Sequence, residues 1–328
     1  MPFGAKTVPG GSGGPPAPVG RLAPSPTGKL HVGHARSFLL AWWSVRRRGG
    51  IVRLRLEDLD AARARPELVD TALRDLEWLG LDWDGEVLRQ SADLTPYREA
   101  VAGLFASGAA YPCVCSRREI LAAASAPPGG EVRYPGTCRD RFADVAAAER
   151  AAEGPAGVRL RVAPGPVTVR DALRGDAAFD VEAEVGDLLL ARRDGVFAYQ
   201  LAVVVDDARQ GVTEVLRGDD LFSSAARQRL IGAALGLGEP GWVHVPLVVG
   251  DDGERLAKRR GDLGLASLRE EGLDARALVA WAARSAGVEV DGPLTAAEVA
   301  PAFELAGVPA APARFGESEL AEVRAWRA

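Results

Sequence analysis

The segment Arg21-Leu-Ala-Pro-Ser-Pro-Thr-Gly-Lys-Leu-His-Val-Gly-His-Ala-Arg36 predicts a short strand, a tight turn and the start of a helix. Its prolines and first glycine favour the turn, and two histidines follow where the helix would begin. Helix N-termini carry unpaired N–H groups and a partial positive charge, which suit phosphate groups. Two histidines alone would be an ordinary polar helix face, but the chain has only 3 and this pair follows a Pro/Gly turn. We therefore expect His31 and His34 to contact a triphosphate, and the chain to carry out chemistry on ATP.

The residues that follow predict an α/β fold of the Rossmann type. A strand at 51–56 follows a helix at 31–48, which completes a strand–helix–strand unit. Glu57 comes directly after the second strand. Because the carboxyl ends of parallel strands meet at one edge of a sheet, Glu57 should lie near the histidines.

The rest of the chain divides into segments by composition. Residues 196–205 are almost continuously apolar, as in a buried strand, so we expect the sheet to resume there. The expected boundaries are a disordered Gly/Pro-rich tail at 1–19, the two halves of the catalytic domain at 20–96 and 196–250, an insertion at 97–195, and a loop with a short helical region at 251–328.

The composition excludes several classes of protein. The 328 residues are 47% hydrophobic, enough for a large core, yet no apolar run approaches the roughly 20 residues of a membrane span. Residues 1–20 lack the apolar stretch of a secretory signal, so we expect a cytoplasmic protein with reduced cysteines. A net charge of −5 argues against general DNA binding. It leaves room for a local RNA site, for which the arginines at 46–48 and 117–118 are weak candidates.

Three motifs resemble those of a known family. Residues 23–34, Ala-Pro-Ser-Pro-Thr-Gly-Lys-Leu-His-Val-Gly-His, resemble the HIGH-type motif of class I aminoacyl-tRNA synthetases, in the form of the glutamyl and glutaminyl branch. Residues 254–261, Glu-Arg-Leu-Ala-Lys-Arg-Arg-Gly, resemble the KMSKS loop, with Lys258 as its second lysine and Arg255 in place of the first. Residues 197–207 and 211–221 also resemble this branch.

The resemblance implies which residues form the active site. Those expected around glutamate are Arg21, Leu22, Ala23, Pro24, Ser25, Glu57, Tyr199 and Arg217. Those expected at ATP, which Mg²⁺ accompanies, are His31, Gly33, His34 and Lys258, and the two histidines and the lysine are the expected catalytic residues. The chemistry agrees, because a substrate with two carboxylates and one ammonium needs guanidinium groups and a carboxylate. Considered alone, Tyr199 would be interpreted as a residue packed in the core, and Arg217 as one partner of a surface ion pair.

The cysteines are one ligand short of a tetrahedral zinc site. Cys113, Cys115 and Cys138 all lie in the expected insertion, and from the residues alone they are either zinc ligands or plain buried thiols. The run from Tyr134 to Cys138 resembles the zinc-binding insertion of short paralogues of glutamyl-tRNA synthetase, which implies one structural zinc with Tyr134 as the fourth ligand. Water or His244 are the alternatives for that position.

The length of the chain and the residues in its motifs favour the short paralogues over full-length synthetases. Only residues 262–328 follow the KMSKS-like loop, too few for an anticodon-binding domain, and Glu214 stands where full-length enzymes usually have histidine. The resemblance implies activation of L-glutamate with ATP in the absence of tRNA, then transfer to queuosine at the wobble position of tRNA(Asp). We expect a monomer that binds neither DNA nor membranes. The rivals are a truncated synthetase for tRNA(Glu), a small-molecule adenylate-forming ligase, and a non-catalytic relative that binds RNA or glutamate.

Overall fold

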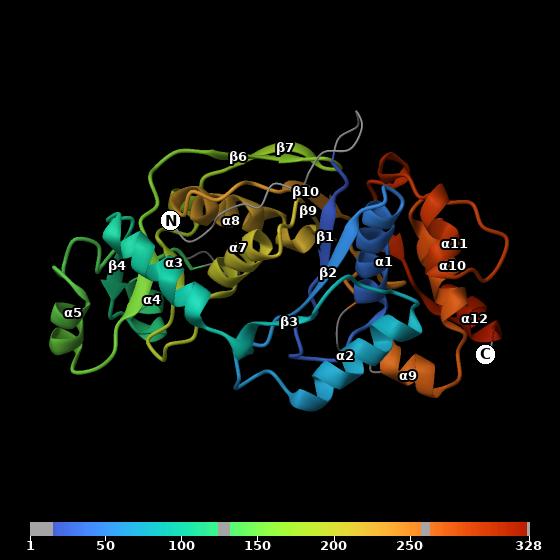
Figure 1. Cartoon of the computed structure of the whole chain (residues 1–328), viewed down its shortest axis with the longest axis horizontal. Helices are drawn as coiled ribbons and strands as arrows, with labels where there is room; N and C mark the ends of the chain where they lie inside the picture. The colour runs from blue at the N-terminus through green and yellow to red at the C-terminus, as the bar shows by residue number, and fades with distance from the viewer. Residues whose placement is uncertain (1–15, 124–131, 257–262, 327–328) are drawn as a thin grey trace.

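The computed structural model describes residues 16–123, 132–256 and 263–326. Lys258 and most of the tail expected at 1–19 lie outside the described residues. The chain is elongated along one axis (Figure 1). One end carries β4 (Ala110–Cys113) and α5 (Val145–Ala152), and the other carries α10 (Ala275–Ser285) and α12 (Glu317–Ala325).

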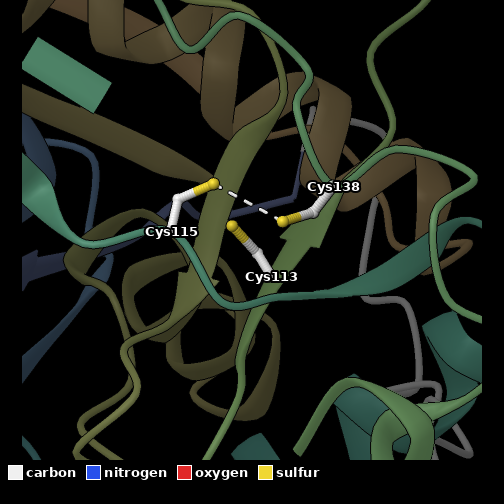
Figure 2. A group of neighbouring side chains, drawn as sticks. All are labelled: Cys113, Cys115 and Cys138. Carbon is white, nitrogen blue, oxygen red and sulfur yellow. Dashed lines mark hydrogen bonds between the residues drawn. The ribbon is translucent and has the colours of Figure 1, made fainter. Parts of the chain in front are cut away.

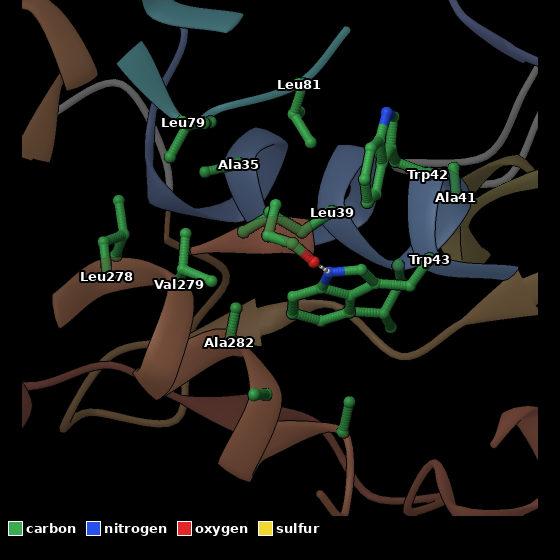
Figure 3. Close-up of a cluster of buried hydrophobic side chains, with 14 of the residues drawn as sticks. Ala35, Leu39, Ala41, Trp42, Trp43, Leu79, Leu81, Leu278, Val279 and Ala282 are labelled. Atoms are coloured by element: carbon green, nitrogen blue, oxygen red, sulfur yellow. Dashed lines mark hydrogen bonds between the residues drawn. The ribbon is translucent and has the colours of Figure 1, made fainter. Parts of the chain in front are cut away.

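The predicted strand–helix–strand unit is confirmed. β1 (Val19–Leu22) and β2 (Ile51–Leu56) run parallel, and α1 (Val32–Arg46) connects them. Figure 3 shows α1 packed against α10, with Leu39 and Trp43 in the buried layer between them. The indole N–H of Trp43 donates to the carbonyl of Ala296 at 2.9 Å, so the helix is fixed by a polar contact as well as by apolar packing.

The parallel strands form a sheet whose order reverses between β1 and β9 (Glu214–Gly218). β3 (Leu88–Arg89) pairs with β2, whereas the N–H of Thr213 donates to the carbonyl of Val19 at 2.8 Å and places β9 on the other side of β1. Beyond β9 the order is β10 (Gly241–Val245), β6 (Val167–Asp171) and the antiparallel β7 (Gly175–Phe179). In open α/β sheets, ligands bind at the carboxyl ends of the strands where the order reverses.

The expected insertion is only partly separate from this sheet. β4, β5 (Gly157–Leu160) and β8 (Leu188–Ala191) form a small antiparallel sheet of their own. In contrast, β6 lies within 97–195 but pairs in parallel with β10 through Trp242 and Asp171. The helices of this region are α3 (Thr95–Ala106), α4 (Arg117–Ala123), α5 and α6 (Val181–Glu184).

The strand expected at 196–205 is wrong. Residues Tyr199–Arg209 form α7, a helix whose residues Leu201, Ala202, Val203 and Val205 are all buried. A helix covered on several sides is apolar on several sides, and its sequence then has the same composition as a buried strand. The chain returns to the sheet at β6 and β7, before α7, and again at β9 after it.

The C-terminal region is helical, as expected. Most of its buried apolar residues belong to the same core cluster as those of α1. Its elements are α9 (Leu265–Glu270), α10, α11 (Ala296–Val299) and α12, with β12 (Ala313–Arg314) parallel to β11 (Val248–Val249). The other elements are α2 (Pro66–Trp78), α8 (Phe222–Ala234), and the 3₁₀ helices Gln90–Ala92, Asp219–Leu221, Ala300–Ala302 and Leu305–Gly307. Across the described ranges, no helix has the length and apolar character needed to cross a membrane.

Candidate active site

A cavity of 320 Å³ lies where β1, β2 and β9 end, at the reversal of strand order. The position agrees with the rule for open α/β sheets. Its lining includes most of the residues predicted to bind glutamate or ATP, namely Arg21, Ala23, Pro24, Ser25, His31, Gly33, His34, Glu57, Tyr199 and Arg217. Segments far apart in the sequence thus bring the predicted groups together, while their individual roles remain predictions.

One predicted site residue is absent from this lining, and another is not among the described residues. The side chain of Leu22 is fully buried in the hydrophobic core. Alternate residues of a strand point to opposite faces, so β1 presents Arg21 to the cavity and turns Leu22 away from it. Lys258 lies outside the described residues, although Leu256 lines the cavity and Gly264 forms a β-bridge with His31.

The two histidines form the N-terminal cap of α1. Nδ1 of His31 accepts the N–H of Gly33 at 3.1 Å, and Nδ1 of His34 accepts the N–H of His31 at 3.2 Å. Because each Nδ1 is an acceptor, a neutral ring must carry its proton on Nε2. The helix start therefore places imidazole N–H donors beside its own backbone N–H groups, which suits phosphate oxygens.

Glu57 is fixed at the cavity wall by a buried arginine. The guanidinium of Arg55 donates to Asp207 at 2.7 Å and lies 3.3 Å from Glu57, while the hydroxyl of Ser25 donates to Glu57 at 3.0 Å. Burial raises the pKa of Glu57 above its ordinary value, against the attraction of Arg55 and Arg21. Arg21 lies 3.8 Å from Asp207, so its charge is partly balanced. A carboxylate in this position can accept a substrate ammonium.

Arg217 differs from Arg21 because its partners are uncharged. Its guanidinium donates to Nε2 of His244 at 3.0 Å, to the amide oxygen of Gln228 at 2.8 Å and to the carbonyl of Leu221 at 3.2 Å. The residue is only 6% exposed, and burial lowers its pKa. Within the described residues no carboxylate forms an ion pair with it. A buried guanidinium without a counter-charge attracts an anionic ligand.

Behind Arg217 lies a residue that the sequence analysis considered only as a metal ligand. Nδ1 of His244 is 2.6 Å from Asp171, and the backbone N–H of His244 donates to the same carboxylate at 3.0 Å. Burial lowers the pKa of His244. The proximity of its ring to Asp171 and Arg217, away from the cysteines, excludes His244 as the fourth metal ligand.

Sequence reasoning missed the supporting residues. The available signal was a polar residue inside a mainly apolar strand, as for His244 in β10 and for Arg55, one of two arginines in β2. Two acidic residues of α7, Asp206 and Asp207, are engaged within the protein. Asp206 is fully buried and accepts from Tyr97 at 2.7 Å, and Asp207 accepts from Arg55. These contacts point to structural roles for both.

The three cysteines converge in the insertion, as Figure 2 shows. Their sulfur atoms lie within 4.8 Å of one another, and Cys115 and Cys138 are 3.4 Å apart. The hydroxyl of Tyr134 lies 3.4 Å from the sulfur of Cys113 and 3.8 Å from that of Cys115. These four side chains, which we call the Cys₃Tyr cluster, are the ones predicted.

The spacing of the Cys₃Tyr cluster fits a tetrahedral metal ion. Zinc–sulfur bonds of about 2.3 Å place sulfurs about 3.8 Å apart, and an oxygen ligand at about 2.0 Å lies about 3.5 Å from each sulfur. Arg159 donates to Cys113 at 3.4 Å and its guanidinium lies 3.7 Å from the ring centre of Tyr134, which favours anionic ligands. Burial and the hydrogen bond with Cys138 raise the pKa of Cys115 to about 12, so a metal would have to displace protons.

The arginines at 46–48 are engaged within the protein. Arg46 contacts Asp82 at 2.8 Å, Arg47 pairs with Glu304, and Arg48 contacts Glu214 at 2.5 Å. Their charges are therefore balanced by nearby carboxylates. The structure gives no support to this cluster as an RNA site.

The fold and the cavity define a class I aminoacyl-tRNA synthetase core. The family model of tRNA synthetases class I (E and Q), catalytic domain, matches residues 19–321, and the chain belongs to this family. A relative from Symbiobacterium thermophilum is 44% identical over 315 residues, covering 92% of this chain and 97% of the relative. Another from Deinococcus radiodurans is 50% identical over 259 residues, covering 77% and 84%. Both relatives are named glutamyl-Q tRNA(Asp) synthetase.

Solved structures confirm the fold. A glutamate-tRNA synthetase from Elizabethkingia anophelis superposes with a TM-score of 0.80 at 24% identity, covering 93% of this chain and 69% of that one. Methionyl-tRNA synthetase from Mycobacterium tuberculosis superposes with a TM-score of 0.53 at 13% identity. The predicted α/β fold of the class I type is therefore correct.

Proposed function

We propose that this chain activates glutamate with ATP without needing RNA, and transfers the glutamate to queuosine in the wobble position of tRNA(Asp). The observation that carries the first half is Arg217, a buried guanidinium at the cavity whose described partners are all neutral. The acceptor is inferred from the names of the relatives, which the chain matches over most of its length.

The amino-acid site has the charges that glutamate requires. Arg21 and Arg217 line the cavity together with the carboxylate of Glu57, while the other lining carboxylate, Asp220, pairs with Arg255. Two guanidinium groups match two carboxylates, and Glu57 matches the ammonium. Tyr199 is 40% exposed and lines the same cavity, so its ring can contact the substrate rather than the core.

In the activation step, an oxygen of the glutamate α-carboxylate attacks the α-phosphorus of ATP. The new bond gives glutamyl-adenylate, and the bond to pyrophosphate breaks. The Nε2–H groups of His31 and His34 and the N-terminus of α1 stabilise the phosphate charge, and Lys258 neutralises pyrophosphate as it leaves. Mg²⁺ bound with ATP would supply further positive charge. No side-chain nucleophile is needed.

In the transfer step, a hydroxyl of the queuosine diol attacks the activated carbonyl and AMP departs. Asp206 and Asp207 are occupied by buried partners, so we assign neither as the base. The hydroxyl proton can instead be taken up by the phosphate of the adenylate, which leaves as part of AMP.

We propose one structural zinc in the Cys₃Tyr cluster. The donor set of three sulfurs and one phenol oxygen is typical of a closed site with no position for a substrate. Bound there, the metal would tie the loop that carries Cys138 to β4. The monomeric state and the cytoplasmic location remain predictions.

The proposal is tested by transfer of labelled glutamate, with ATP, to three RNAs: tRNA(Asp) with queuosine, the same tRNA without it, and tRNA(Glu). We expect label only on the first. Label on tRNA(Glu) would instead identify a synthetase that charges that tRNA. Product formation that resists ribonuclease would favour a small-molecule ligase.

A further inference from the structure

The surroundings of Arg217 raise the question of how a buried arginine keeps both its orientation and its full charge. An ion pair with a carboxylate would fix the guanidinium but would also neutralise its positive charge. Here three neutral acceptors hold it instead, from His244, Gln228 and Leu221. Its guanidinium also lies 5.1 Å from the ring centre of Trp242.

The hydrogen-bond directions fix the state of His244. Arginine can only donate, so Nε2 of His244 must accept and the proton of the neutral ring must lie on Nδ1. That proton is donated to Asp171 at 2.6 Å. The ring is fully buried, and its centre lies 5.0 Å from that of the Phe222 ring, so it is packed on this side as well as hydrogen-bonded.

The carboxylate of Asp171 is stabilised by hydrogen bonds from groups other than Arg217. One of its oxygens accepts the backbone N–H groups of Leu173 at 3.0 Å and Arg174 at 2.8 Å. The other accepts both N–H groups of His244. The imidazole ring therefore lies between the carboxylate and the guanidinium. It orients Arg217 without bringing a negative charge into contact with it.

We propose that His244, oriented by Asp171, is a positioning residue that aims Arg217 into the cavity, and that neutral support from His244 and Gln228 leaves the Arg217 charge for a substrate carboxylate. The inference rests on the proposed function, in which Arg217 binds glutamate. It assigns a role in substrate recognition to three residues that do not line the cavity, His244, Asp171 and Gln228. It also explains why β6 must pair with β10, since this pairing brings Asp171 to His244.

Two substitutions of His244 separate its two hydrogen bonds. His244→Gln places an amide oxygen near the position of Nε2 and keeps an acceptor for Arg217, whereas His244→Asn keeps a donor for Asp171 and removes that acceptor. The readout is glutamate-dependent ATP–pyrophosphate exchange without RNA, with KM measured for glutamate and for ATP. We expect His244→Asn to raise the KM for glutamate about tenfold to a hundredfold, the range for a lost hydrogen bond to a charged group. The KM for ATP should change little, and His244→Gln should stay within a few-fold of the wild type.

Two substitutions of Gln228 test the role of the Arg217 charge directly and leave no cavity in the core. Gln228→Glu places a carboxylate against Arg217 with almost no change of shape, and Gln228→Met removes the acceptor without adding charge. We expect Gln228→Glu to raise the KM for glutamate at least tenfold and to do so more than Gln228→Met, even though it strengthens the contact with Arg217. Melting temperatures measured in parallel identify any variant that fails to fold.

The outcomes distinguish the two proposals. Wild-type protein without glutamate-dependent exchange would overturn the proposed function and this inference with it. An active wild type, together with folded His244→Asn and Gln228→Glu variants whose KM for glutamate is unchanged, would overturn the inference alone. Equal rises in the KM for ATP and glutamate would also contradict it, because they would indicate general damage.

Discussion

The glutamate cavity and the Cys₃Tyr cluster organise their polar groups in opposite ways. In the cavity, the charged side chains of Glu57 and Arg217 are fixed by other parts of the protein, as Arg55 lies 3.3 Å from Glu57 and His244 accepts from Arg217 at 3.0 Å. In the cluster, the donor atoms face one another, with two sulfurs 3.4 Å apart. The cavity is therefore preorganised by the chain itself, whereas the cluster, in our proposal, would need a cation to hold its ligands in their anionic form.

Removing the charge of Arg217 should give the largest effect. Arg217→Met leaves the cavity without its unbalanced guanidinium, so we expect kcat/KM for glutamate in pyrophosphate exchange to fall at least a hundredfold. Arg284→Met is a matched control, because Arg284 pairs with Glu322 on the C-terminal helices. An Arg217→Met variant as active as this control would show that the charge of Arg217 is not needed to bind the substrate.

Removing a cysteine should affect the cluster and spare the cavity. Cys138→Ser, or treatment with a strong chelator, should release about one zinc per chain and lower the melting temperature of the insertion. Transfer to tRNA should fall sharply, while exchange without RNA stays within a few-fold. Metal analysis and the two activity assays check this. Equal loss of both activities would mean that the two regions are not independent.

Substituting Glu57 should have a moderate, pH-dependent effect. Its pKa is raised by burial, so ionisation and ammonium binding are lost as the pH falls through a value above that of a free carboxyl group. We expect Glu57→Gln to raise the KM for glutamate about tenfold at pH 8 and to flatten the acid limb of the pH profile. An unchanged acid limb in the variant would assign that limb to another group.

The smallest effect should come from Asp75, which neither region uses. Its carboxyl group is fully buried, pairs with Arg269 at 3.3 Å, and has no hydrogen-bond partner among the described residues. Burial raises its pKa from 3.8 to about 6, so its contribution favours folding at low pH and is lost as the pH rises between these values. We expect Asp75→Asn to raise the melting temperature by about 2–4 °C at pH 8 and to have little effect at pH 4. A lower melting temperature at both pH values would show that the pair with Arg269 is stabilising overall.

The sequence predicted the parts of the fold that are local. The Pro/Gly turn, the cap of α1 and the position of Glu57 after β2 all follow from short-range patterns. The type of α7 could not be predicted, because its burial depends on the helices and strands around it. The supports of the site, Arg55 and His244, were also missed, since each acts on a residue distant in the sequence.

The cysteine cluster shows a different limit. Spacing alone gave three possible ligands, and only the resemblance to related insertions pointed to Tyr134. The structure places its hydroxyl 3.4 Å from Cys113 and puts His244 in a different network. Zinc ligands in proteins are mostly cysteine, histidine and carboxylate side chains, so residue type alone does not single out a tyrosine.

The most direct test of the account is ATP–pyrophosphate exchange in the absence of RNA, with glutamate and glutamine as competing substrates. The two differ only in the side-chain carboxylate, so a cavity with an unbalanced guanidinium must prefer glutamate. We predict exchange with glutamate, and a kcat/KM for glutamine at least a hundredfold lower. Equal exchange with both amino acids, or none until tRNA is added, would contradict the claim that the chain itself preorganises a site for glutamate.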